Sequence, residues 1–136
     1  MITLNSSAID TNILLYSLDE TDVRKQKISI EIIDQNPYIS SQNLSEFINV
    51  LLFKWKIKKS SCEYLVTQIL ETCKFYSNSE AIYYNSFNLI KKYDFQLFDA
   101  IVVASALEAG CEVLYTEDMH HQLFVNGQLK IINPFL

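Results

Sequence analysis

The alternation of short apolar segments with longer segments of helical periodicity limits the possible folds more than any other feature of this sequence. Stretches typical of strands lie at Ile2–Ile9, Tyr38–Ser40, Lys74–Ser77, Glu112–Tyr115 and Leu129–Ile132. Short strands separated by helices favour a parallel sheet with helices on both faces. We therefore predict an α/β fold, in which a short five-stranded parallel sheet is flanked by about six or seven helices.

Helical spacing of apolar residues, together with start and stop signals, marks the helices between these strands. Asn36-Pro37 ends one helix, because the residue before a proline avoids the helical conformation. Gly110 ends another as a left-handed cap. The predicted helices are Ile13–Leu18, Asp22–Gln35, Asn43–Lys58, Ser61–Cys73, Glu80–Tyr93 and Asp99–Ala109.

The composition is that of one globular domain over residues 1–136. Hydrophobic residues make up 49% and charged residues 20% of the chain, which excludes intrinsic disorder. No apolar run approaches the roughly 18 residues of a membrane span, and the first residues lack the basic flank of a secretion signal. The three cysteines are widely spaced and form no Cys-x-x-Cys pair, so we expect neither a disulfide framework nor a zinc knuckle, and a reducing compartment.

Three acidic residues lie in the connections between predicted strands and helices, and a fourth lies at the start of a helix. Asp10 follows the first strand, Asp118 follows the fourth, Glu46 lies early in the helix after the second strand, and Asp99 opens a very apolar helix. Taken singly, each could cap a helix, with Glu46 completing a capping box begun by Asn43. Together they would be crowded at one end of the sheet, and unpaired carboxylates at short range repel one another. No Lys or Arg adjoins them, whereas a divalent cation would relieve the repulsion.

The type of ligand indicates the class of metal. Oxygen ligands without a His or Cys cluster suit Mg²⁺ or Mn²⁺ better than zinc. His120 and His121 are adjacent and would point about 100° apart on a helix, so we do not expect both to face one metal site. Either could instead lie at the rim of the site. A hydrated Mg²⁺ ion can activate water for attack on phosphorus, which is phosphodiester hydrolysis. Asn12 could orient such a water and Thr116 could support a carboxylate, although ordinary turn chemistry explains both equally well.

At these residues the sequence resembles the PIN-domain family, in particular the VapC-type toxins of prokaryotic toxin–antitoxin pairs. The similar segments are Ile9–Tyr16, Asn43–Phe47, Phe98–Ala106 and Leu114–Met119, with Asn126-Gly127 and Ile132–Phe135 near the end. The resemblance implies an endoribonuclease that uses Mg²⁺, with Mn²⁺ able to substitute. It implies that the catalytic metal ligands are Asp10, Glu46, Asp99 and Asp118, supported by Asn12 and Thr116.

The resemblance also implies partners. It points to a cytoplasmic homodimer that acts on RNA and is inhibited by a protein antitoxin whose tail blocks the site. One departure is visible, because family members often carry a glycine shortly after the last acid and residues 119–124 contain none. The shape of that loop and of the substrate rim is therefore expected to differ.

Charge and apolar patterning leave several alternatives open. The net charge of −5 does not favour nucleic acid, although bound cations would offset it and basic residues cluster at 24–27 and 54–59. The helix from Asn43 has two apolar stripes, so a second packing surface for it must come from this domain or from another chain.

A PIN-like RNA-processing domain and a non-catalytic binding module remain alternatives. An aspartyl phospho-acceptor domain would need a lysine at the end of the last strand, whereas Lys130 lies near its beginning.

Overall fold

The computed structural model describes residues 6–136, and a six-stranded sheet forms its centre. The strand order is β3-β2-β1-β4-β6-β5, and all neighbours are parallel except β5 and β6. The strands are β1 (Ser7–Ile9), β2 (Tyr38–Ser40), β3 (Lys74–Tyr76), β4 (Val113–Tyr115), β5 (Phe124–Val125) and β6 (Leu129–Ile132). The predicted α/β class is confirmed. The sheet has one strand more than predicted, and residues 2–5 of the predicted first strand lie outside the described residues.

The additional strand, β5, is only two residues long and antiparallel to β6. The hairpin between them turns at Asn126 and Gly127, whose φ angles are +51° and +66°. Two left-handed residues in succession form the turn that an Asn-Gly pair favours. That pair between two apolar runs is thus a hairpin signal that the prediction of a wholly parallel sheet did not use.

Six α-helices surround the sheet, in agreement with the lower predicted number. They are α1 (Thr11–Tyr16), α2 (Val23–Ile33), α3 (Ser41–Asn49), α4 (Lys59–Thr72), α5 (Glu80–Tyr93) and α6 (Leu97–Glu108). Gly110 follows α6 with a φ of +81°, as expected of a left-handed cap. Among these helices, none is long and apolar enough to cross a membrane.

The predicted helix Asn43–Lys58 is wrong in its second half. The α-helix ends at Asn49 and is followed by a π-helical turn, η1 (Val50–Lys54). The wider turn closes with a bond from the Trp55 amide to the Val50 carbonyl, and the chain reverses at Lys56, where φ is +56°. The second apolar stripe predicted on this helix comprises Val50, Phe53 and Ile57. Ile57 packs into the core of this domain, whereas Phe53 is 67% exposed.

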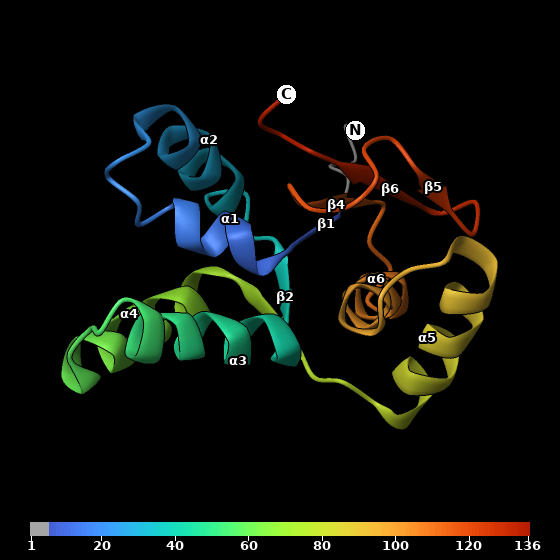
Figure 1. The fold of residues 1–136 in the computed structure, drawn as a ribbon, viewed down its shortest axis with the longest axis horizontal. Helices are drawn as coiled ribbons and strands as arrows, with labels where there is room; N and C mark the ends of the chain where they lie inside the picture. The colour runs from blue at the N-terminus through green and yellow to red at the C-terminus, as the bar shows by residue number, and fades with distance from the viewer. Residues whose placement is uncertain (1–5) are drawn as a thin grey trace.

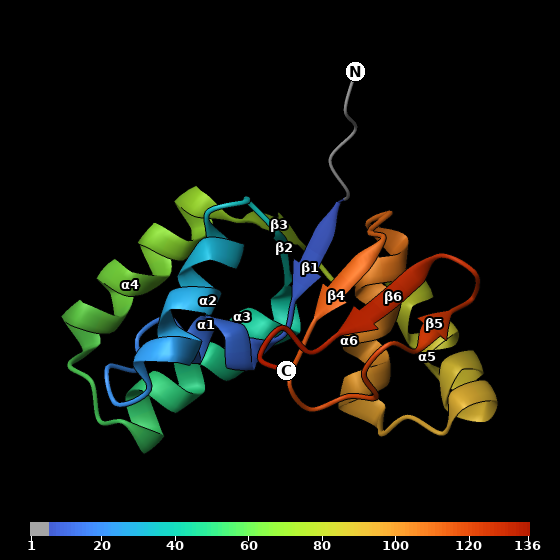
Figure 2. The same cartoon turned by 90° about the horizontal axis from the view of Figure 1, so that it is seen from above.

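Alternating residues of the strands divide the core into two layers. Ala8 and Leu114 belong to a cluster with α5 and α6, whereas their neighbours Ile9 and Tyr115 pack with α1–α4. Successive side chains of a strand point to opposite faces, so the two clusters lie on opposite faces of the sheet. Figures 1 and 2 show this arrangement, with α1–α4 on one side of the strands and α5 and α6 on the other.

The reversal of strand order between β1 and β4 decides where a site can form. From β1 the chain runs outward to β2 and β3, and it later returns to place β4 on the other side of β1 (Figure 2). Parallel α/β sheets bind ligands beyond the carboxyl ends of the strands at such a reversal. Ile9 is in register with Tyr115, so Asp10 and Thr116 leave the sheet next to each other.

The three cysteines take no part in this edge of the sheet. Cys62, Cys73 and Cys111 are buried and free, as expected for thiols that serve the core. Burial raises the pKa of the Cys73 thiol to about 11, so this thiol is protonated and unreactive at neutral pH.

Candidate active site

The four predicted acids all lie beyond the carboxyl ends of the central strands. Asp10 directly follows β1, Asp118 lies in the loop after β4, Glu46 is on the second turn of α3, and Asp99 is in the first turn of α6. Their charges act on one another: Glu46 and Asp99 raise the pKa of Asp10, and Asp118 and Glu46 raise that of Asp99. The fold therefore brings together side chains that lie up to 108 positions apart in the sequence.

Asp10 is the most enclosed of the four, with 7% of its surface exposed. Its Oδ1 accepts hydrogen bonds from the Thr11 amide at 2.8 Å and from Asn43 Nδ2 at 3.1 Å, and its Oδ2 accepts one from Thr116 Oγ1 at 2.8 Å. Burial raises its pKa from 3.8 to about 6, although the bonds from Thr116 and Thr11 oppose the shift. Asp10 also caps α1, so one carboxylate fixes both the helix start and the site.

The amino-terminal cap of α3 connects this helix to Asp10. Ser40 Oγ accepts from the Asn43 amide at 3.1 Å and donates to Asn43 Oδ1 at 2.8 Å, so these two residues cap the helix. The alternative in which Glu46 completes a capping box is therefore wrong. The Asn43 amide group, held in this way, turns its Nδ2 to Asp10 and to Thr11 Oγ1.

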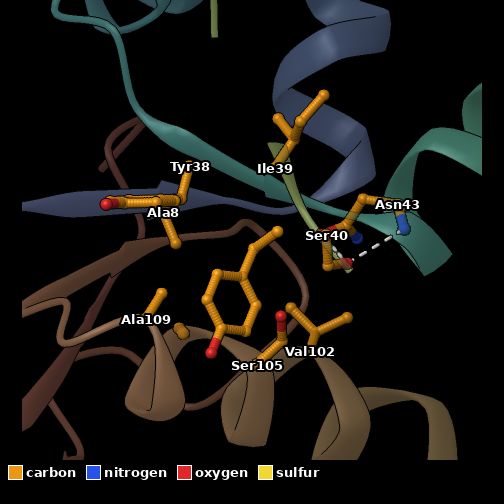
Figure 3. A pocket seen from close by; sticks show the side chains of 10 residues that line it. Ala8, Tyr38, Ile39, Ser40, Asn43, Val102, Ser105 and Ala109 are labelled. Atoms are coloured by element: carbon orange, nitrogen blue, oxygen red, sulfur yellow. Dashed lines mark hydrogen bonds between the residues drawn. The ribbon is translucent and has the colours of Figure 1, made fainter. Parts of the chain in front are cut away.

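Figure 3 shows the Ser40–Asn43 bond beside a small space under the sheet. Ala8, Val102 and Ser105 also line this space, whose volume is about 10 Å³. A space of that size holds about one water molecule. It is part of the packing behind Asp10 and is not a ligand pocket.

Glu46 has two neutral donors of its own. Its Oε2 accepts from Thr11 Oγ1 and its Oε1 from Gln42 Nε2, both at 3.0 Å. Through Thr11 and Asn43, the carboxylates of Asp10 and Glu46 therefore belong to one hydrogen-bond network. Such a network fixes the direction of both carboxylates without neutralising either charge.

Asp118 is held by the residues predicted to support the site. Asn12 Nδ2 donates to Asp118 Oδ2 at 3.0 Å, and the Asp118 amide donates to Thr116 Oγ1 at 3.2 Å. Thr116 is fully buried and links this loop to Asp10. No helix follows Asp118, so the alternative in which it caps a helix is also wrong.

Asp99 is half-buried and accepts no hydrogen bond from the residues that the structure describes. Gln96 occupies the N-cap position of α6, so Asp99 does not cap this helix. Burial raises its pKa, with further contributions from Asp118 and Glu46. The amino end of α6 favours a negative charge in its first turn, but the neighbouring carboxylates oppose it.

Within the described part of the chain, no basic side chain forms an ion pair with any of the four acids. The one ion pair among residues 6–136 joins Lys25 to Glu117, which faces away from the four acids. Carboxylates without a cysteine or a basic partner are the donor set that a hard divalent cation prefers. The residue types therefore fit such an ion. In the described residues, however, no three His, Cys, Asp or Glu side chains are arranged so that they could hold one as they stand.

An open cavity of about 240 Å³ lies beside Asp99 and Asp118. Its remaining lining comes from the turn between α5 and α6 and from the loop after β4, namely Tyr93, Asp94, Phe95, Gln96, Met119, His120 and Leu123. His120 thus has the rim position that the sequence left open, whereas His121 Nδ1 accepts a hydrogen bond from the Asn133 amide. The cavity gives a ligand access to two of the four acids.

Sequence reasoning missed part of this site. It treated Asn43 only as a helix cap and did not single out Ser40 or Gln42. The polar run Ser40-Ser41-Gln42-Asn43 directly after a strand is a signal for such a network, since strand ends of parallel sheets face the ligand crevice. Nothing local in the sequence connects Lys25 with Glu117, which lie 92 positions apart.

Residues 8–123, which include all four acids, match the PIN domain. The chain belongs to the PIN domain family. The match begins within β1 and ends before β5, and it confirms the resemblance inferred from the acid segments. Comparison with curated protein sequences gives no match.

Solved structures agree with the PIN assignment at the level of the fold. A chain of a toxin–antitoxin complex from Klebsiella pneumoniae aligns with a TM-score of 0.70 and 24% identity, over 95% of this chain and 98% of that one. VapC20 of Mycobacterium tuberculosis, a toxin that cleaves the sarcin–ricin loop, aligns with a TM-score of 0.65 and 15% identity, over 83% and 90%. FitAcB from Neisseria gonorrhoeae gives 0.67 and 16%, over 95% and 98%.

Proposed function

We propose that this PIN domain is an endoribonuclease that depends on Mg²⁺, with Mn²⁺ able to substitute, and that it is the toxin of a VapBC-type toxin–antitoxin pair. The observation that carries the proposal is the convergence of Asp10, Glu46, Asp99 and Asp118 at the reversal of strand order with no basic partner. A protein stabilises such a cluster at neutral pH by protonation or by a cation. The donor chemistry favours a hard divalent cation.

Each acid has a definite part in this proposal. Asp10 is the fixed ligand, since three donors orient its oxygens. Asp99 and Asp118 border the open cavity and would complete the ligand set from that side. Glu46 completes the set through its link to Thr11. When bound, the ion supplies an activated water and positive charge against the phosphate.

Asn12 and Thr116 act on the acids and not on the ion in this proposal. Asn12 holds Asp118 toward the site, and Thr116 ties the loop of Asp118 to Asp10. The RNA strand would approach through the cavity beside Asp99, which Phe95 and His120 also line. Three aspartates and no lysine or arginine line this cavity, so it suits a base or ribose better than a phosphate.

The proposal includes two protein partners. The toxin–antitoxin complexes among the structural neighbours support an antitoxin, which would act by covering the cavity. Exposed aromatic residues on α5, Tyr83, Tyr84 and Phe87, support a second copy of the chain as the other partner. Light scattering of the purified protein, alone and with the product of a neighbouring gene, tests both associations. A cytoplasmic location is part of the same proposal.

The central test compares the wild type with Asp10→Asn and Asp99→Asn. Purified proteins are incubated with a mixed-sequence RNA in Mg²⁺, in Mn²⁺ and in EDTA, and Mn²⁺ binding is measured by calorimetry. We expect cleavage by the wild type with either metal only, and loss of both cleavage and binding in both variants. Glu31→Gln, an exposed change on α2, is the matched control. Undiminished cleavage by either Asn variant would refute the site.

The Mn²⁺ measurement and one additional labelling experiment separate the alternatives. A wild type that folds but binds no Mn²⁺ would favour the non-catalytic binding module. Stable labelling of Asp10 by a small phosphodonor would favour the phospho-acceptor domain. That alternative loses support from the position of Lys130, which is the second residue of β6 and does not stand at its carboxyl end.

A further inference from the structure

Glu117 stands between two residues of the site but faces the opposite way. Its Oε1 accepts a hydrogen bond from the Tyr16 hydroxyl, and its Oε2 forms an ion pair with Lys25 Nζ. Its neighbours Thr116 and Asp118 instead contact Asp10 and Asn12. Residues 117–119 form a bend after β4, and within it the side chain of Glu117 is held away from the contacts that its two neighbours make.

Two aromatic rings flank the lysine of the Lys25–Glu117 pair. Lys25 Nζ lies 4.6 Å from the ring centroid of Tyr16 and 5.4 Å from that of Phe135, and these two rings meet edge to face at 5.1 Å. The two charged side chains are each 26% exposed. A pair in this setting is more strongly coupled than a free surface pair, because less water screens it.

The backbone of Glu117 is held as well. Its amide donates to Asn12 Oδ1 at 3.4 Å, and its carbonyl accepts from Asn133 Nδ2 at 3.5 Å. Asn12 is also the donor to Asp118. A shift of Glu117 would therefore move both the carboxylate of Asp118 and the amide that holds it.

The charge of Glu117 gives the pair a second effect. Without Lys25, Glu117 would be an unpaired carboxylate one residue from Asp118 and would add to the repulsion among the four acids. Held by the Tyr16 hydroxyl alone, it would also be less fixed and would compete with Asp118 for the same site. Lys25 is the one basic residue that the described structure pairs with an acid. Its partner is Glu117, which is not one of the predicted metal ligands.

We propose that Tyr16, Lys25 and Glu117 form a clamp that positions Asp118 in the metal site and keeps a fifth carboxylate out of it. The clamp joins α1, α2 and the loop after β4, so Lys25 acts on the reaction from a helix that contributes no ligand. The proposal rests on the proposed nuclease function. It concerns positioning residues and not additional catalytic ones.

The test uses Lys25→Met, Glu117→Gln and the double variant. We expect Lys25→Met to lower the rate of RNA cleavage at saturating substrate by roughly tenfold, since small misplacements of a reacting group are costly. Glu117→Gln should lose less, because it leaves no extra charge. The double variant should recover to the level of Glu117→Gln, and Lys25→Arg should retain most of the wild-type rate. If the three residues served only to stabilise the fold, Lys25→Met and Glu117→Gln would lose equal cleavage activity, and each loss would follow the loss of thermal stability.

Two further readouts complete the design. Mn²⁺ affinity should fall no more than about twofold in Lys25→Met while the rate falls, because the freed carboxylate adds negative charge near the ion. Exchange of the Asp118 amide hydrogen, which is bonded to Thr116, should be faster in Lys25→Met. Lys27→Met and Glu31→Gln, both exposed on α2, are the controls and should change none of these quantities.

The outcomes distinguish the clamp from the function on which it rests. A wild type that cleaves no RNA and binds no Mn²⁺ would overturn the nuclease, and with it the clamp's role in one. Faster Asp118 exchange in Lys25→Met would then mark the contact as structural only. An active wild type with an equally active, equally stable Lys25→Met variant would overturn the clamp and leave the nuclease intact.

Discussion

Asp10 and Asp118 face one site from neighbouring strands, yet the protein holds them in opposite ways. Asp10 is buried, has three hydrogen-bond donors and has its pKa raised to about 6. Asp118 is exposed, and the only side chain that donates to it among residues 6–136 is Asn12. The first acid is a fixed part of the fold, whereas the second is positioned by a loop. Changes at the two should therefore separate stability from activity.

The largest effect is expected for Asp10→Asn. Loss of the fixed ligand should lower RNA cleavage by a factor on the order of 10³ or more in Mg²⁺. In EDTA at pH 7.5 the same variant should be more stable than the wild type by about 2–3 kcal/mol, because it removes a buried charge. Cleavage assays and urea unfolding measure the two quantities. A variant that is both inactive and less stable would contradict the account of Asp10 as a buried carboxylate whose charge destabilises the metal-free fold.

Asp118→Asn should affect activity alone. The amide keeps the shape of the side chain but weakens its use as a ligand, so we expect a loss of cleavage on the order of 10²-fold. The free energy of unfolding should stay within about 0.5 kcal/mol of the wild type, since the side chain is exposed. Unfolding in EDTA and cleavage in Mn²⁺ test this. A stability gain like that of Asp10→Asn would remove the contrast between the two acids.

The contrast also predicts a pH dependence of stability without metal. Asp10 has a higher pKa in the folded chain, about 6, than its ordinary value of 3.8. Between these values the folded state keeps a proton that the unfolded state releases. The free energy of unfolding should therefore fall as pH rises from about 4 to 7, by about 2–3 kcal/mol from this group. Urea titrations in EDTA should show the fall in the wild type and a flatter profile in Asp10→Asn; identical profiles would contradict it.

The smallest expected effect comes from Thr116→Val, which removes the link between the two acids. Thr116 donates to Asp10 and accepts from the Asp118 amide. We expect a loss of about 1–2 kcal/mol in stability, since a buried donor to a carboxylate is removed, and roughly tenfold in cleavage. Thr116→Ser keeps the hydroxyl and should restore cleavage. No restoration by Ser would assign the effect to packing of the methyl group instead.

The sequence predicts the placement of the acids better than their contacts. The alternation of strands and helices, with Asp10 directly after one strand and Asp118 in the loop after another, is sufficient to place both at one edge of a parallel sheet. It is not sufficient to show that Asn43 serves Asp10, because Asn after a strand is also a common helix cap. The Lys25–Glu117 pair depends on how α2 packs against the loop after β4, and no local pattern encodes that packing.

The pairing of β1 with β4 has a consequence for synthesis of the chain. Asp10 is made early, but its partner Thr116 and the strand that β1 lies against are made about a hundred residues later. Contacts between such distant positions form late in folding. A nascent or prematurely terminated chain that ends before β4 would hold three of the four acids but would lack Asp118 and the Thr116 hydroxyl that binds Asp10. The ribosome would thus complete nearly the whole chain before the site could exist.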